Sequence, residues 1–101
     1  MRPRLEFHEI LCEILGSRNV YFQPPANVKM SYPAIVYRLD YIDNNSANNK
    51  VYIQDKRYQV IVIDKDPDSI ISDKVSQLPQ CTFDRNYTSD NLNHFSYTIY
   101  Y

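Results

Sequence analysis

The chain has 101 residues, of which 44% are hydrophobic and 23% are charged. These proportions match ordinary globular domains, and a chain of this length can bury one core, so we expect a single domain over residues 1–101. Eleven basic and twelve acidic side chains give a formal net charge of −1, which disfavours a protein that binds mainly by neutralising nucleic-acid phosphates. No apolar run approaches the ~20 residues that cross a bilayer, and the N-terminal segment is not typical of a signal peptide, so we expect synthesis in the cytoplasm and no membrane partner.

Tyrosine and cysteine usage is the next feature of the composition. The chain has ten tyrosines and no tryptophan. Tyrosine is enriched at protein interfaces and also favours strands, and the sequence does not decide between these two explanations. Cys12 and Cys81 are far apart and flanked by apolar residues, so we expect free, buried thiols and no disulfide.

The first half of the chain predicts one helix and two strands. Apolar residues recur on one face from about Pro3 to Leu15, and Gly16 stands where a left-handed cap would end an amphipathic helix. Val20–Gln23 predicts a short strand that ends at the prolines after it. Ala34–Ile42 alternates apolar and polar residues, which predicts a strand with one face exposed to solvent.

The middle of the chain predicts an exposed arm and then a buried strand. Asp43–Lys50 has no periodicity and is rich in side chains that satisfy turn backbones, so we expect a hairpin tip or arm there. Val51–Gln54 is expected to extend its returning side. Arg57–Asp64 has a nearly continuous apolar centre, which predicts a central strand covered on both faces.

The last third predicts a capped helix and two further strands. Asp66 is the expected N-cap, with Pro67 at the first helical position. Three groups are expected to share a face within their element: Ile70, Ile71, Val75 and Leu78 on the helix; Cys81, Phe83 and Arg85 on the next strand; and Phe95, Tyr97, Ile99 and Tyr101 on the last. The order α-β-β-β-α-β-β predicts an α+β fold, with both helices packed on one side of an antiparallel or mixed sheet.

No set of residues indicates catalysis, and two partial metal motifs have simpler explanations. The acidic run from Asp64 to Asp68 resembles the start of a calcium loop, but a proline interrupts it and the closing glutamate is missing, so we expect helix-start carboxylates. His8 and Cys12 lie one helical turn apart without a third zinc ligand nearby. The chain contains no nucleophile elbow or glycine-rich phosphate loop. We therefore expect no enzyme activity, no metal and no cofactor.

A family resemblance spans nearly the whole chain. The chain resembles the small tail terminator or tail-completion proteins of long-tailed phages and prophages, which are also described as minor capsid or head-tail joining proteins. The segments that carry the resemblance are Tyr32–Tyr37, Arg57–Ile63, Asp64–Ser69, Leu78-Pro79, Phe83–Arg85 and Tyr87–Leu92.

The resemblance implies a structural role in the virion. It implies a homo-oligomeric ring, typically hexameric, that caps the tail tube, stops polymerisation of the major tail tube protein and joins the tail to the head connector, with DNA only passing through. Such a family has no catalytic residues. We expect subunit or tube contacts on the arm and its base, although a merely solvated hairpin tip is an equal alternative. The expected contact residues are Asn44, Asn45, Asn48, Asn49, Lys50, Tyr52, Lys56 and Arg57.

A second function stays open on the sequence alone. The basic pair Lys56-Arg57 and the tyrosine-rich strands could form a stacking platform for single-stranded nucleic acid. The alternative is therefore a small nucleic-acid or accessory binding module of a prophage.

Overall fold

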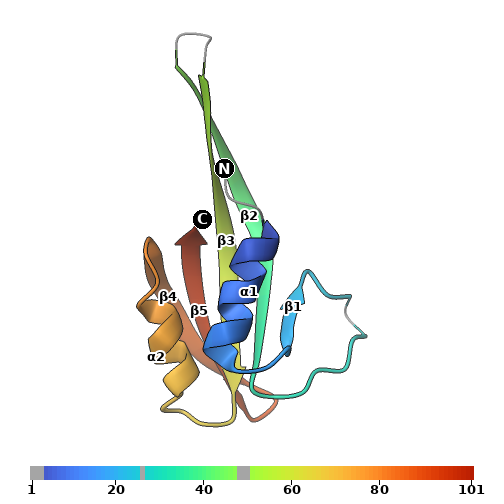
Figure 1. Ribbon diagram of the computed structural model, residues 1–101. Coiled ribbons are helices and arrows are strands. Elements are labelled where there is room, and N and C mark those ends of the chain that lie inside the picture. Colours follow the sequence, from blue (N-terminus) through green and yellow to red (C-terminus); the bar gives the residue numbers. More distant parts are fainter. Residues whose placement is uncertain (1–3, 26, 48–50) are drawn as a thin grey trace.

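The structure is a computed structural model that describes residues 4–25, 27–47 and 51–101. Both helices lie in front of one five-stranded sheet (Figure 1). The elements in chain order are α1 (Arg4–Leu15), β1 (Val20–Phe22), β2 (Ala34–Ala47), β3 (Val51–Asp64), α2 (Ile70–Ser76), β4 (Cys81–Ser89) and β5 (Leu92–Tyr100). The α+β class and the placement of both helices on one side are therefore confirmed.

The sheet is mixed, with the strand order β1-β2-β3-β5-β4. β1 pairs with β2 in parallel, whereas the other neighbours are antiparallel. β3 is thus central, as its apolar sequence predicted. Among the described residues, no helix is long and apolar enough to span a membrane.

Aromatic rings fill the core between α1 and the sheet. The Phe7 ring lies 5.5 Å from the Tyr37 ring and 5.0 Å from the Tyr58 ring, measured between centroids. These three residues and Leu11 are almost completely buried, and Val75 brings α2 into the same cluster. Buried aromatic residues remove a large apolar area from water and prefer such offset contacts, so this cluster holds α1 on the sheet.

Left-handed backbone positions close several turns in a chain with one glycine. Gly16 has φ 78° directly after α1, and its N–H donates to the Cys12 carbonyl at 2.8 Å, which confirms the predicted cap. Asp90 and Asn91 have φ values of 54° and 62° between β4 and β5. Two left-handed residues form the type I′ turn that suits a two-residue hairpin, so an Asp-Asn pair serves here without glycine.

The predicted start of the second helix is wrong by three residues. The N-cap is Ser69, whose hydroxyl accepts the Ser72 N–H at 3.2 Å and donates to Asp64 at 2.8 Å. Asp64 and Asp66 instead accept the N–H groups of Asp66 and Asp68, at 3.0 and 2.9 Å. These two local turns fold the acidic run into a loop, so the helix begins only after it.

The apolar stripe of α2 also differs from the prediction. Ile70 is 67% exposed, whereas Ser72 is buried. The Ser72 hydroxyl hydrogen-bonds the Tyr97 hydroxyl, which also donates to the Ser72 carbonyl at 3.1 Å. A polar residue can therefore face the core, because its hydrogen-bonding groups have partners there.

Two expectations about the strands are wrong. A register shift between Phe83 and Arg85 places Arg85 on the face of β4 opposite to Phe83, because a bulge inserts one extra residue. β3 is not fully covered on both faces, since Gln59 and Ile61 are only half-buried on the side without helices.

The free state of both thiols is confirmed, with Cys12 buried and Cys81 half-buried.

Candidate functional site

The outer half of the β2–β3 hairpin projects from the body of the molecule as a two-stranded ribbon (Figure 1). β5 pairs with β3 only from Arg57 inward, and β1 pairs with β2 only over residues 35–37. Within the described part of the chain, residues 41–47 and 51–56 therefore form strand pairs only with each other, and the Lys56 carbonyl also accepts the Tyr101 N–H at 3.0 Å. We call this segment the ribbon. It gives the protein its elongated dimensions of 51 × 25 × 22 Å.

The strands of the ribbon are longer than the alternation of the sequence predicted. Residues 43–47, which are polar except for Ala47, continue β2 because they pair in register with the returning strand, in which Val51 and Ile53 favour β structure. The arm itself was predicted, but as a turn-like segment.

The predicted contact residues are distributed along the ribbon. Asn44 and Asn45 lie on β2 opposite Gln54 and Ile53, and Tyr52 lies on β3 opposite Ser46. Lys56 and Arg57 lie at the base. Asn48, Asn49 and Lys50 fall outside the described residues. A contact role for all eight residues stays a prediction.

Arg57 fixes the base of the ribbon and is not a free cation. Its guanidinium pairs with Asp40 at 3.1 Å and lies 5.0 Å from the centre of the Tyr41 ring. The Tyr100 hydroxyl and Asp40 raise the pKa of Arg57, the hydroxyl most. A register shift between Leu39 and Tyr41 puts this tyrosine on the same face as Arg57. The contacts of Arg57 with Asp40 and Tyr41 therefore set the direction in which the ribbon leaves the sheet.

The side of the sheet that points away from the helices carries a network of polar side chains. We call this side the back. Arg38 on β2 donates to Gln59 at 2.8 Å, and Gln59 donates to Ser96 at 3.4 Å. Thr98 donates to Asp84 at 2.8 Å. By strand register, the back is formed mainly by Val36, Arg38, Tyr41, Arg57, Gln59, Ile61, Arg85, Tyr87, His94, Ser96, Thr98 and Tyr100.

An aromatic stack adds to the back near the β4–β5 turn. The Tyr87 ring stacks on His94 at 4.8 Å with an interplanar angle of 14°, and the Arg85 guanidinium lies 5.3 Å from the Tyr87 ring centre. Neighbouring side chains thus hold these groups in place. Tyrosine and arginine are the residue types enriched at protein interfaces, and prior ordering lowers the entropy lost on binding. Sequence reasoning missed this part of the back, since it placed Arg85 with Phe83.

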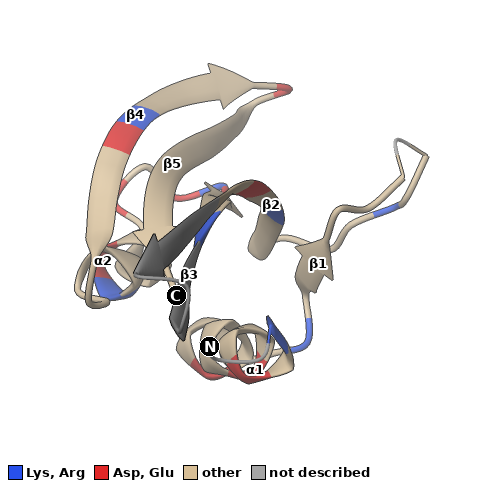
Figure 2. Cartoon of the chain, turned by 90° about the horizontal axis from the view of Figure 1, so that it is seen from above, with Lys and Arg blue, Asp and Glu red and all other residues tan. Residues whose placement is uncertain are grey.

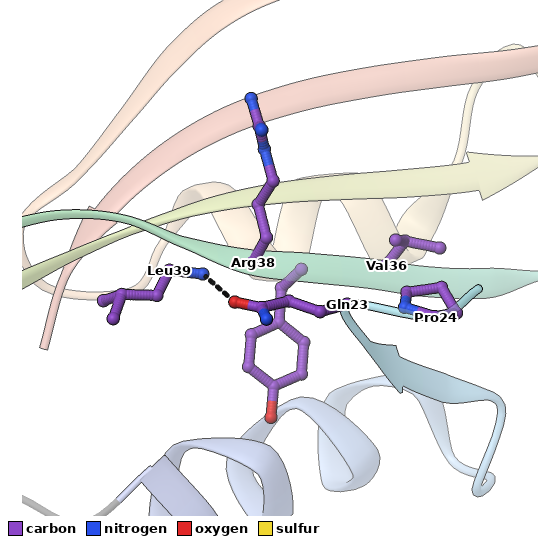
Figure 3. A pocket seen from close by; sticks show the side chains of 6 residues that line it. Gln23, Pro24, Val36, Arg38 and Leu39 are labelled. Carbon is purple, nitrogen blue, oxygen red and sulfur yellow. Dashed lines mark hydrogen bonds between the residues drawn. The ribbon is translucent and has the colours of Figure 1, made fainter. Parts of the chain in front are cut away.

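A shallow hollow of about 420 Å³ lies where β1 ends beside β2. Gln23 has a left-handed φ of 45°, and its N–H donates to the Tyr37 carbonyl at 2.9 Å. Its side-chain oxygen accepts the Leu39 N–H at 3.1 Å (Figure 3). The side-chain oxygen of Gln23 thus takes the place of a further backbone carbonyl of β1 beside the Leu39 N–H, and the pairing of β1 with β2 ends there. Pro24 and Val36 form part of the lining.

Beneath α1, His8 belongs to a small polar cluster with Tyr37. The Tyr37 hydroxyl lies 2.7 Å from His8 Nδ1 and accepts from Arg4 at 3.1 Å. Burial, and then the charge of Arg4, lowers the pKa of His8, while burial raises the pKa of Tyr37. His8 is therefore tied to a core tyrosine and not directed at Cys12 as a ligand pair.

Two observations concern metal-binding and nucleophilic side chains. No group of three or more potential metal-ligating side chains comes together among the residues that the structure describes. Burial raises the pKa of the Cys81 thiol to about 11, which opposes formation of a thiolate nucleophile at neutral pH. The notable surfaces are the ribbon and the back, and both are suited to binding.

Comparison with known proteins leaves these surfaces to be interpreted on their own terms. No protein-family model matches the chain, and no curated protein matches its sequence.

Proposed function

We propose that this protein is a structural, non-catalytic component of a phage virion that forms a ring on the end of the tail tube. In this role it stops growth of the tube and joins the tail to the head connector. The subunit is made in the bacterial host cytoplasm and ends in the virion at the head-tail interface. Its partners are other copies of itself, the major tail tube protein and the connector protein.

The observation that carries the proposal is the ribbon. Both of its edges lack a neighbouring strand in the described chain, and unpaired strand edges readily accept another chain. A projecting element of this kind is costly as an isolated feature, because an exposed two-stranded hairpin is marginally stable at best in water. Its use in contacts between chains explains why it extends so far from the body.

The back supports the same role better than nucleic-acid binding. Its tyrosine and arginine side chains already contact one another: the Arg57 guanidinium lies 5.0 Å from the Tyr41 ring centre, and that of Arg85 lies 5.3 Å from the Tyr87 ring centre. Base stacking needs free aromatic faces. We therefore keep a nucleic-acid or accessory binding module of a prophage as the alternative, to be tested by a salt-dependent shift in the mobility of single-stranded DNA.

The test is assembly on tail tubes. The purified protein is added to polymerising tail-tube protein from the same phage or prophage, and tube lengths are measured by negative-stain microscopy together with particle mass. We expect a multimer and shorter, capped tubes. A monomer that leaves the length distribution unchanged refutes the proposal, and salt-sensitive DNA binding by that monomer supports the alternative.

A further inference from the structure

The back of the sheet carries two exposed guanidinium groups without an acidic partner. Ion pairs in the described part of the chain join Arg18 with Glu9 and Arg57 with Asp40, and neither Arg38 nor Arg85 takes part in one. Arg38 donates to a neutral amide, and Arg85 lies over a tyrosine ring. The positive charge of both groups is therefore available to a partner.

The outer side of α1 carries the complementary charge. Glu6, Glu9 and Glu13 are exposed and follow a spacing of three and four residues, so they lie along one stripe of the helix. Figure 2 shows the acidic residues of α1 on the side turned away from the sheet. Glu9 is paired with Arg18, which leaves Glu6 and Glu13 for a partner. Leu5 beside them is 65% exposed.

The spacing of the two pairs of charges is compatible. Arg85 lies opposite Ser96, and Ser96 lies opposite Ile61. Ile61 lies opposite Val36, two residues from Arg38. Three strand spacings of ~4.8 Å and two residues of ~3.4 Å separate the two arginine backbones by roughly 16 Å.

On the helix, seven residues at 1.5 Å each separate Glu6 from Glu13 by about 10 Å along the axis. Long arginine stems that lean toward each other can close the remaining ~6 Å. Half-buried Val36 and Ile61 lie beside the line that joins the two arginines and offer an apolar floor to Leu5.

We propose that α1 of one copy docks across the back of a second copy, with Glu6 and Glu13 facing Arg38 and Arg85. The occupant is a second copy because the same chain supplies both surfaces. Among the described residues, the back has two positive charges without an acidic partner, and the outer side of α1 has two unpaired negative charges. The two surfaces differ, so the contact is heterologous and repeats from copy to copy until a ring closes. This inference rests on the proposed function and names the subunit contact of that ring.

Charge reversal gives a strict test. A back variant carries Arg38→Glu with Arg85→Glu, and a helix variant carries Glu6→Arg with Glu13→Arg. Each variant alone brings like charges together at every contact, so we expect at least a tenfold loss of association in particle-mass measurements. An equimolar mixture restores opposite charges at both kinds of contact, so we expect assembly to return, as it should in a single chain with all four changes.

The matched control for the back variant is Lys29→Glu with Lys65→Glu, which changes the net charge by the same amount at exposed positions outside both surfaces. Circular dichroism confirms that each variant is folded. The inference is overturned if either variant alone assembles like the wild type. It is also overturned if the mixture and the fourfold variant are both folded but both fail to assemble. If the wild type still forms rings that cap tubes, the proposed function survives that failure. If the wild type neither assembles nor alters tube length, the proposed function itself fails.

Discussion

Shortening the ribbon should leave the body of the protein folded. The change deletes residues 44–54 and joins Asp43 to Asp55 through Asn-Gly, which keeps the register of the remaining strands. The cross-strand pairs lost are worth about 0.2–1 kcal/mol each, while ordering each backbone residue costs about 1–2 kcal/mol. The ordering cost that is no longer incurred outweighs the four lost pairs, so we expect the free energy of unfolding to fall by no more than about 1 kcal/mol.

The assay is thermal unfolding followed by circular dichroism, together with particle mass and tube length. A change of 1 kcal/mol moves the midpoint by roughly 4–8 °C in a domain of this size. Leu11→Ala is the matched core control, because Leu11 is fully buried and its truncation should cost about 2–5 kcal/mol. If the shortened chain loses as much stability as this control, the ribbon belongs to the folding core and our reasoning is refuted. If its assembly is unchanged, the ribbon is not a contact element.

Three further predictions concern the body. Ser69→Ala should lower the free energy of unfolding by about 1 kcal/mol in urea titrations, since it removes the N-cap of α2. Gly16→Ala should cost about 1–2 kcal/mol because φ is 78°, whereas Gly16→Asn should cost less; equal costs would contradict a conformational cause. The pKa of His8 is lowered from 6.5 by burial and by Arg4, so the unfolded chain takes up its proton first as the pH falls. The contribution of neutral His8 to the free energy of unfolding is complete above pH 6.5 and is lost as the pH drops toward the lowered pKa. His8→Gln should therefore reduce the pH dependence of the free energy of unfolding between about pH 7.5 and 5.

Elements with clear periodicity could be predicted from the sequence. Tyr58, Val60 and Val62 alternate along β3 and are all buried against the helices. In α1, Leu11 and Leu15 are one turn apart on the predicted apolar face, and both pack into the core. Burial itself imposes these periods of two and of about four residues, so the sequence carries them directly.

The start of α2 was predicted wrongly because several neighbouring polar residues can each serve as its N-cap. Asp64, Asp66, Asp68 and Ser69 are all acceptable caps by residue type. The structure selects Ser69 because Asp64 binds both its hydroxyl and the Asp66 N–H. Such a choice depends on several simultaneous hydrogen bonds, and no single position in the sequence shows it.

Part of the back could not be predicted, because Tyr41 and Arg85 reach it only through two bulges. The shift at Leu39/Tyr41 brings Tyr41 to the face of Arg57, and the shift at Phe83/Arg85 brings Arg85 to the face of Ser96. One extra residue reverses the face of every side chain that follows it. Alternation read without the bulges therefore assigns these residues to the wrong side.

The body and the ribbon differ in how completely their polar groups are satisfied, and hydrogen exchange can measure that difference. Among the described residues, no buried side-chain nitrogen or oxygen lacks a hydrogen-bond partner. Outer strand edges of the ribbon have no neighbouring strand, so alternate backbone N–H groups over residues 41–47 and 51–56 face outward.

In the free subunit, these outward amides should exchange quickly, while amides of the central segment around Val60 and Val62 exchange slowly. Assembly should slow exchange along the ribbon edges and leave the centre of β3 unchanged. If assembly slows exchange only in the back and α1, and not along the ribbon, the contact between copies belongs to those two surfaces alone. Equal exchange before and after assembly at all three places would contradict every contact proposed for this chain, because a strand edge or side chain that joins another copy must exclude water from it.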